Sequence, residues 1–282
     1  MVSLVELSRV VVDEVAAEEF LRGVGVLRRF DVCPFCGGVG FGRVRRGRYR
    51  CYGCGREWGA RWGSVLEGLR APLSKFVLAV KLFEMDLSVR QAARQLELAY
   101  NTVYDIFMLL RNSIFGIDVD TSFSGEIELD EAYFGGKRPG RRGRGAGGKI
   151  PVFGILERGG KVRVEVVADV AGQTLVGMAL GKVRRGSLVY TDRFRSYDGL
   201  VTYGFRHQRI DHGQRFANGK VYINGIEGFW SYAKERLSKY HGLSPNKFPL
   251  YLKELEFRYN NRDTDLHDQL LQLLAKKTSG TN

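Results

Sequence analysis

The sequence GEIELDEAYFGGK runs from Gly125 to Lys137 and combines a strand pattern with four acids. Its apolar positions predict a β-strand over Glu126–Phe134. Asp130 lies inside this strand, where a carboxylate costs several kcal/mol unless it is paired or binds a cation. The strand therefore marks a position where an acid needs a specific partner in the folded protein.

Strand and helix patterns continue on the carboxyl side of this stretch. Residues 150–156 and 161–168 predict a hairpin across Gly159-Gly160, residues 174–183 a helix, and residues 187–192 another strand. The order strand, strand, strand, helix, strand and then helices indicates a mixed sheet flanked by helices. We assign this domain to residues 125–270 and treat residues 271–282 as a tail.

Two further acids occupy informative positions. Asp192 ends the predicted strand 187–192, and Glu227 lies on a helix that begins near Ile223. Three convergent carboxylates repel one another until a hard cation such as Mg²⁺ or Mn²⁺ neutralises them. Two such ions can bind the attacking and the leaving oxygen of a phosphodiester displacement. Asp130, Asp192 and Glu227 are therefore candidate ligands for two catalytic ions.

The predicted helix after Ile223 carries two more candidates. Lys234 follows Glu227 by seven residues, so at 100° per residue both lie on the same flank of the helix. Lys234 could then hold a DNA phosphate beside the metals, although a Glu–Lys pair on a solvated helix face is the ordinary alternative. Asn224 is a rival ligand on this helix.

The first strand also carries two rival acids. Glu128 is expected on the same sheet face as Asp130, whereas Glu131 is expected on the opposite face, because side chains alternate along a strand. Both stay open as alternatives at this point.

All four cysteines lie between positions 33 and 54. They form two Cys-x-x-Cys pairs separated by fourteen residues: Cys33, Cys36, Cys51 and Cys54. Two tight turns at this spacing can aim four thiolates at one tetrahedral Zn²⁺. The alternative is a pair of disulfides, which a cytosolic setting disfavours. Four protein ligands leave no open coordination position, so we predict a structural zinc in a ribbon over residues 31–62.

The formal net charge of +13 indicates a polyanionic partner, because clustered Lys and Arg displace counterions from phosphate backbones. Arginines alternate with aromatic residues around the second cysteine pair, with Glu57 as the only acid from position 43 to 61. This pattern favours nucleic-acid binding over a merely solvated arginine face. The arginines concerned are Arg43, Arg45, Arg46, Arg48 and Arg50.

A second basic segment interrupts the predicted sheet. Residues 135–149 hold seven glycines and no acid, which predicts a cationic loop insertion that contacts DNA phosphates. The alternative is a disordered insertion. Its basic residues are Lys137, Arg138, Arg141, Arg142, Arg144 and Lys149.

Three short helical patterns follow Pro72. The second opens at Ser88, which with Gln91 fits a capping box. Short helices in this succession favour a helix-turn-helix over residues 72–116, although any three-helix packing unit has the same periodicity. Its last helix would offer four residues to a major groove: Tyr100, Asn101, Thr102 and Tyr104. Residues 1–30 are expected to form a separate helical segment.

The sequence as a whole resembles insertion-sequence DDE transposases with an amino-terminal zinc ribbon and helix-turn-helix, the ISXO2-like or IS1595-type family. Three segments carry the resemblance: ELDEAYFGGK from Glu128, YTD ending at Asp192, and NGIEGFWSYAK from Asn224. Asp192 and Glu227 are separated by thirty-four residues, a spacing common in that catalytic class. The closing RYNNR from Arg258 is also similar.

The resemblance implies an α+β multidomain chain with an RNase H-like mixed α/β catalytic domain. It implies Asp130, Asp192 and Glu227 as Mg²⁺ or Mn²⁺ ligands and Lys234 as a DNA-positioning residue. Some relatives have Asn where others have Glu at the third ligand, so Asn224 stays an alternative, although a carboxylate suits a second hard cation better. The implied reaction forms no covalent intermediate with the protein, so it requires no Ser, Tyr or Cys nucleophile.

The implied activity has two steps. Water attacks the phosphodiester at each element end, and the freed 3′-hydroxyl then attacks target DNA, in a two-metal-ion reaction on DNA that carries the terminal inverted repeats. Paired ends imply at least a homodimer on DNA. The rival functions are a zinc-ribbon regulator with a degenerate catalytic domain and a metal-dependent nuclease that cuts without joining.

The chain shows no membrane-spanning or secretory pattern. No apolar run approaches the roughly 18 to 20 residues that cross a bilayer. The amino terminus carries acids such as Glu6 and Asp13 among its apolar residues, unlike a secretory signal. We therefore expect a cytoplasmic, nucleoid-associated protein with no membrane partner.

Overall fold

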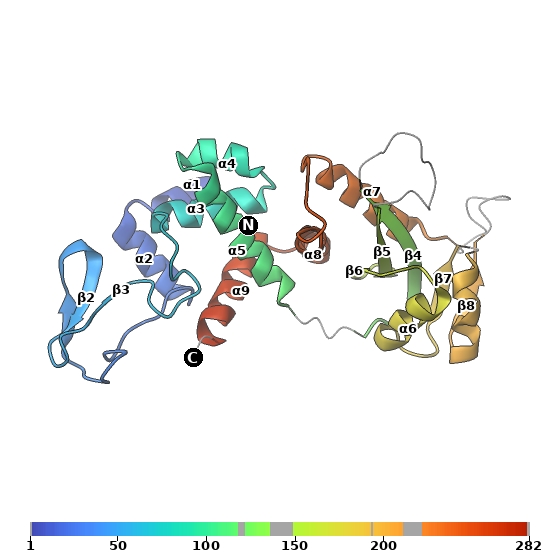
Figure 1. The fold of residues 1–282 in the computed structure, drawn as a ribbon, viewed down its shortest axis with the longest axis horizontal. Helices are drawn as coiled ribbons and strands as arrows, with labels where there is room; N and C mark the ends of the chain where they lie inside the picture. Colours follow the sequence, from blue (N-terminus) through green and yellow to red (C-terminus); the bar gives the residue numbers. More distant parts are fainter. Residues whose placement is uncertain (1, 118–121, 136–148, 193, 211–221, 281–282) are drawn as a thin grey trace. The chain divides into compact units, whose positions relative to one another are not determined.

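The computed structural model describes residues 2–117, 122–135, 149–192, 194–210 and 222–280. The chain divides into two compact units. The first comprises Met1–Gly116 and Asn261–Asn282, and the second comprises Ile117–Asn260; Figure 1 follows the chain through both. Within the described residues, no helix combines the length and the apolar character needed to span a membrane.

Helices dominate the first unit. They are α1 (Leu4–Val10), α2 (Glu14–Gly23), α3 (Leu73–Glu84), α4 (Val89–Leu96), α5 (Tyr100–Phe115) and α9 (Leu266–Gly280). The capping box predicted at Ser88 and Gln91 is present at the start of α4. Pro72 precedes α3 without a side-chain cap, and Glu14 of α2 instead accepts hydrogen bonds from the amides of Leu73 and Ser74. The three helices predicted after Pro72 are thus confirmed.

A small antiparallel sheet completes the first unit. Its order is β1 (Phe41–Arg43), β2 (Arg48–Cys51) and β3 (Glu57–Gly59). Trp58 is buried at its centre and contacts a group of aromatic rings, which are those of Phe30, Phe35, Phe41 and Tyr49. Ten strand residues cannot enclose a core of their own, so this aromatic cluster and the cysteines carry most of the packing.

The carboxyl-terminal helix α9 differs from the sequence expectation. The boundary expected at residue 270 falls inside this helix, which belongs to the first unit together with the segment treated as a tail. Leu270, Leu271 and Leu274 are buried, and α9 packs against α3 and α5. Helix α9 belongs to the first unit because its leucines form an apolar stripe that has to be buried, and the helices of that unit provide the apolar surface.

The second unit is built on a mixed five-stranded sheet. Its order is β6 (Val162–Val166), β5 (Ile150–Glu157), β4 (Glu126–Phe134), β7 (Leu188–Thr191) and β8 (Arg206–Arg209). β4 pairs antiparallel with β5 and parallel with β7. The hairpin predicted across Gly159-Gly160 is the antiparallel β5–β6 pair. The predicted mixed α/β arrangement is confirmed.

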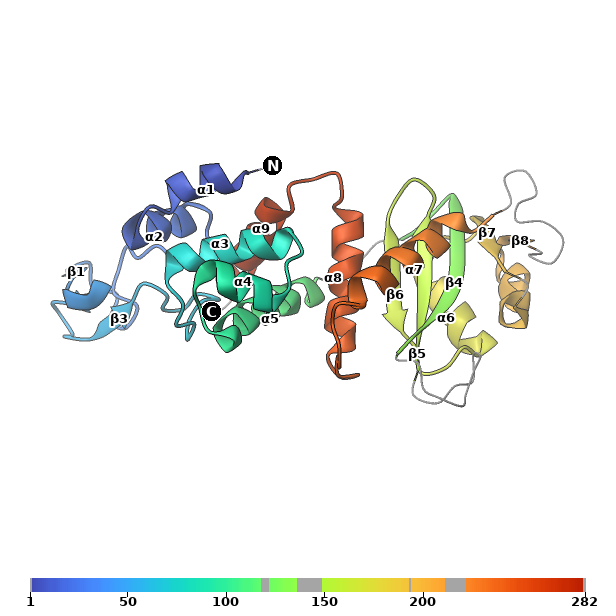
Figure 2. The same cartoon turned by 90° about the horizontal axis from the view of Figure 1, so that it is seen from above.

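Helices cover both faces of this sheet. One core joins Ile127 and Leu129 of β4 to α6 (Gly172–Lys182) and the 3₁₀ helix η2 (Arg195–Tyr203). The other joins Ala132 and Phe134 to α7 (Asn224–Leu237) and α8 (Phe248–Asn260), and Figure 2 shows α7 lying across β4 and β5. Alternation along β4 sends odd and even positions into different cores. The even face, covered by α7, is therefore the one to which Asp130 belongs.

Candidate metal centres

Asp130 and Asp192 lie at neighbouring positions of two adjacent strands. In the parallel pairing of β4 with β7, Glu128 lies opposite Tyr190, so two residues later Asp130 lies beside Asp192, just after β7 ends. One carboxylate oxygen from each of Asp130, Asp192 and Glu131 lies within 4.8 Å of the others. Three acids therefore meet at the centre of the sheet, and we call them the acidic group.

Glu131 joins the acidic group from the other face of β4. Its side chain is buried, and its Oε2 accepts a hydrogen bond of 2.9 Å from the Tyr197 hydroxyl of η2. The expectation that Glu131 faces away from Asp130 holds, since Asp130 contacts α7 and Glu131 contacts η2. Of the two rival acids on this strand, the structure brings Glu131 rather than Glu128 into the acidic group.

The acidic group fits a hard divalent cation. Burial raises the pKa of Asp130 to about 7, with further contributions from the negative charges of Glu131 and Asp192. A hydrogen bond of 3.0 Å from Trp230 Nε1 to Asp130 Oδ2 only partly offsets this rise. Crowded carboxylates of this kind gain most from a bound cation, because its charge removes their mutual repulsion.

Helix α7 packs very closely on the sheet at Asp130. Gly154 of β5 lies directly opposite Asp130 in the ladder. A Cβ atom at Gly154 would lie 2.5 Å from the Trp230 ring and 2.8 Å from the Ile226 side chain. Only glycine therefore allows α7 to approach this part of the sheet. Gly154, Trp230 and Tyr197 were not predicted from the sequence as residues of this site. A glycine inside an apolar strand is the one signal in the sequence that could have pointed to it.

Gly154→Ala is expected to lower the free energy of unfolding of the second unit by about 3 kcal/mol, because the added methyl group overlaps Trp230 and Ile226. Urea unfolding followed by circular dichroism measures the change. Gly177→Ala is the matched control, since Gly177 is exposed on α6 with nothing within 4 Å of its Cβ position. The close packing is refuted if both variants unfold alike.

The remaining predicted residues of this site lie on α7. Asn224 begins the helix and is exposed, Glu227 is half-buried in the first turn, and Lys234 is exposed two turns later. Glu227 precedes Trp230, the residue bonded to Asp130, by one turn. Among the described acids, Glu227 is not one of the three whose oxygens lie within 4.8 Å of one another.

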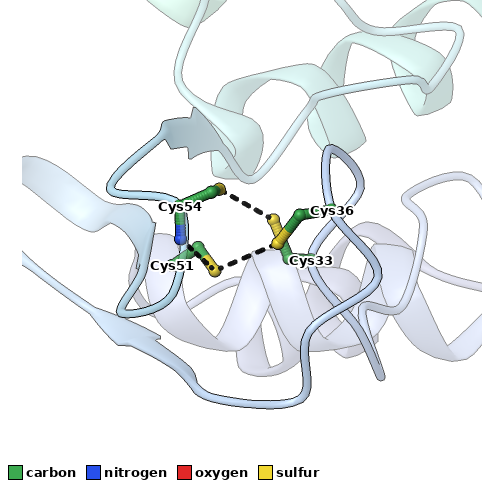
Figure 3. A group of neighbouring side chains, drawn as sticks. All are labelled: Cys33, Cys36, Cys51 and Cys54. Carbon is green, nitrogen blue, oxygen red and sulfur yellow. Dashed lines mark hydrogen bonds between the residues drawn. The ribbon is translucent and has the colours of Figure 1, made fainter.

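The four cysteines gather at one point, as predicted. Figure 3 shows their side chains converging from two turns. The Sγ atoms of Cys33 and Cys54 lie 3.7 Å apart, and those of Cys36 and Cys51 lie 3.6 Å apart. A tetrahedral ion with metal–sulfur bonds of about 2.3 Å separates its sulfurs by about 3.8 Å, whereas a disulfide requires about 2 Å. The thiols are free and spaced for one metal ion.

Backbone amides donate to the sulfurs of two of the four cysteines. The amide N–H groups of Phe35 and Cys54 donate to the Sγ atoms of Cys33 and Cys51, each at 3.5 Å. The Cys54 amide, with that of Gly53, holds the pKa of the Cys51 thiol down to about 7. A thiol deprotonated near neutral pH is ready to bind a metal ion.

The ribbon arginines have different surroundings. Arg43 pairs with Glu18 of α2 and lies over the Tyr49 ring, and Arg48 pairs with Glu57 at 3.3 Å. Arg45 and Arg50 are exposed, and the side chain of Arg46 lies outside the described part. Arg43 thus joins the ribbon to α2, a contact that its neighbours in sequence did not indicate.

The other predicted DNA contacts lie partly outside the described residues. Tyr100 and Asn101 of α5 are exposed, and Thr102 and Tyr104 are half-buried. The Tyr100 and Tyr104 rings stack with centroids 6.2 Å apart. In the basic insertion, Lys149 is half-buried. The residues that lie outside the described part are Lys137, Arg138, Arg141, Arg142 and Arg144.

Known proteins resemble this chain over most of its length. Residues 122–260 match the model of the ISXO2-like transposase domain. An uncharacterized transposase-like protein of Haemophilus influenzae is 45% identical over 116 residues, which are 41% of this chain and 94% of that protein. An uncharacterized protein in transposable element ISH50 of Halobacterium salinarum is 30% identical over 250 residues, which are 80% of this chain and 84% of that protein.

A solved structure is also similar, at a much lower level. The Mos1 mariner paired end complex with Mn is 12% identical, with a TM-score of 0.29 over 73% of this chain and 76% of that chain. A likeness of this size carries no argument about fold or function.

Proposed function

This chain belongs to the ISXO2-like transposase family, and from that premise we propose that it cuts DNA at the ends of an insertion sequence and joins the freed 3′ ends to target DNA. The observation that carries the proposal is the convergence of Asp130 of β4 with Asp192, the residue after β7, which the parallel register of the two strands brings about. Both carboxylates belong to the acidic group, a donor set of oxygens that suits hard divalent cations.

The sheet supports an RNase H-like catalytic domain as the finer description of this unit. β4, β5 and β6 form an antiparallel meander, and β7 and β8 extend it on the other side of β4 in parallel. Asp130 then lies on the central strand β4, under helix α7, and Asp192 directly follows the neighbouring strand β7.

Asp130, Asp192 and Glu227 would hold two Mg²⁺ or Mn²⁺ ions, with Glu131 as a rival to Glu227 and Asn224 as a weaker, neutral alternative. When bound, the ions would activate the attacking hydroxyl and stabilise the leaving oxygen. Trp230 would orient Asp130, and the Asp130 carboxyl, with its pKa near 7, would lose its proton as a cation binds. Tyr197 would hold the Glu131 carboxylate in the same way.

The basic residues supply a path for DNA in this proposal. Lys234 would hold a phosphate near the cleaved strand, together with the basic insertion at 135–149. Arg45 and Arg50 are the ribbon arginines best suited to phosphates, because Glu18 and Glu57 engage Arg43 and Arg48.

The first unit would recognise the terminal inverted repeats. The exposed start of α5, with Tyr100 and Asn101, would enter a major groove, and the four cysteines would hold a structural Zn²⁺. Two element ends need two active sites, so the working assembly would be at least a dimer. A protein acting on such DNA would associate with the nucleoid in the cytoplasm.

The test is a strand-transfer reaction. The purified protein is incubated with Mg²⁺, a target plasmid and labelled duplex carrying the inverted repeats that flank its gene. Labelled plasmid is the expected product, and a duplex with scrambled ends is expected to give none. Cleavage without joined product would reduce the function to that of a nuclease, and end binding without cleavage would favour a regulator.

A further inference from the structure

Helix α7 has no N-cap hydrogen bond from the residue that precedes it in sequence. Ile223 occupies the N-cap position and contributes no side-chain hydrogen bond. The amide N–H of Ile226 lies three residues later, in the first turn, and has no hydrogen-bond acceptor within the helix. The side chain of an N-cap residue usually accepts a hydrogen bond from an amide at this position. Glu128 of β4, 98 residues away in sequence, accepts this hydrogen bond at 2.9 Å through Oε2. A strand carboxylate therefore caps α7 from outside.

Arg158 fixes the capping carboxylate in place. Its Nε lies 2.9 Å from Glu128 Oε1, and its Nη1 lies 2.7 Å from Glu126 Oε2. Its Nη2 also donates to the backbone carbonyl of Tyr222, just before α7 begins. One guanidinium group thus joins strand β4 to the backbone that leads into α7.

Two aromatic rings enclose this guanidinium. Its carbon lies 3.7 Å from the Tyr190 ring centroid and 4.0 Å from that of Tyr222. Tyr190 belongs to β7, two residues before Asp192, and its hydroxyl donates to Glu126 at 3.1 Å. Glu128 is only 1% exposed. Enclosure on this scale holds the guanidinium and carboxylate in one geometry, because charge-assisted bonds and ring stacking both lose strength when water enters.

We propose that Glu128 and Arg158 form a clamp that positions the first turn of α7, and with it Glu227, against Asp130 and Asp192. Glu128 binds the amide of Ile226, the residue directly before Glu227. The rest of α7 has other anchors, namely the Trp230–Asp130 bond and the packing on Gly154. The clamp therefore acts at the one turn that carries the proposed ligand. Its residues are positioning residues and not ligands.

The packing around Glu128 agrees with this role. A Cβ atom on Gly225 would lie 2.8 Å from Glu128 Oε2, so the helix backbone lies directly on the carboxylate. Glu128 shares its sheet face with Asp130 yet is turned away from the acidic group by Arg158 and α7. Its location at the helix end explains why this acid stays outside the metal site.

The clamp rests on the proposed function only because it takes Glu227 as a metal ligand. Mn²⁺ binding to the full chain, without DNA, tests the clamp. Glu128→Gln and Arg158→Lys are each expected to weaken Mn²⁺ binding, measured by titration calorimetry, about tenfold. In a Glu227→Gln background the same changes are expected to have no further effect, because the clamp acts through Glu227. Arg163→Met, which breaks a separate ion pair with Glu165 on β6, is the matched control.

Hydrogen exchange is a second measurement, and it remains informative if either variant is less stable, because it reports on each helix separately. The amides of residues 224–228 are expected to exchange faster in both clamp variants, with α8 unchanged. Wild-type Mn²⁺ affinity in both variants, or equal losses with and without Glu227, would overturn the clamp. Strand transfer by the wild-type protein is a separate measurement, so failure of the transposase proposal would be seen there and not in Mn²⁺ binding.

Discussion

Asp130→Asn and Asp192→Asn are each expected to slow cleavage of element-end DNA roughly a thousandfold, about 4 kcal/mol of lost transition-state stabilisation. Each change removes one carboxylate from the acidic group and with it the charge that holds a cation. Asp130→Asn is also expected to leave the thermal midpoint of the second unit unchanged or higher, because burial, and then the neighbouring carboxylates, raise the pKa of Asp130 to about 7. Single-turnover cleavage and thermal unfolding measure the two effects.

The third ligand is decided in the same series. Glu227→Gln is expected to match the two aspartate variants. Glu131→Gln is expected to keep most activity, because the Glu131 carboxylate lies on the other sheet face and is engaged by the Tyr197 hydroxyl. Asp198→Asn is the control, since Asp198 is an exposed acid of η2 paired with Arg209. Full activity of Glu227→Gln with an inactive Glu131→Gln would transfer the third position to Glu131. Full activity of Asp130→Asn would remove the acidic group from the mechanism.

The acids were predictable from sequence, but their neighbourhood was not. An acid inside an apolar strand is conspicuous, and so is one at a strand end, which is why Asp130 and Asp192 were found. Their alignment depends on β4 pairing in parallel with β7, and strand pairing between distant segments leaves no mark on either pattern. The approach of Glu131 from the opposite face depends on Tyr197, which lies 66 residues away in sequence. Geometry of that kind appears only in the folded chain.

The ribbon arginines show a related limit. Positions 43 to 61 hold one acid, so the five arginines from Arg43 to Arg50 were assigned to phosphates. Arg43 instead meets Glu18, 25 residues earlier in the chain, because α2 packs beside the ribbon. Contacts between distant segments also explain why residues 271–282, predicted to be a tail, belong to the first unit. Buried leucines of α9 pack there against α3 and α5. Local patterns identify elements, and contacts between distant elements decide what each charge does.

Removing the predicted zinc is expected to unfold the ribbon and to weaken DNA binding. Cys33→Ala should lower zinc content from one ion per chain to almost none and unfold the ribbon, because metal binding worth about 10 to 16 kcal/mol in small zinc modules is also their folding energy. Only three short strands and a few aromatic rings remain to hold β1, β2 and β3 together. Binding to element-end DNA is expected to fall at least about a hundredfold, since the ribbon and its arginines lose their fixed positions.

Tryptophan fluorescence follows this change directly. Trp58 is 1% exposed and contacts Phe30, Phe41 and Tyr49, so its emission should shift to longer wavelength when the ribbon opens. The second unit has its own core, so its unfolding in urea should be unaffected. Tyr52→Phe is the control, because Tyr52 is exposed beside Cys51 and contributes no metal ligand. A wild-type protein purified under reducing conditions without zinc, or a Cys33→Ala variant with unchanged emission, would show that the four thiols do not hold the ribbon together through a metal.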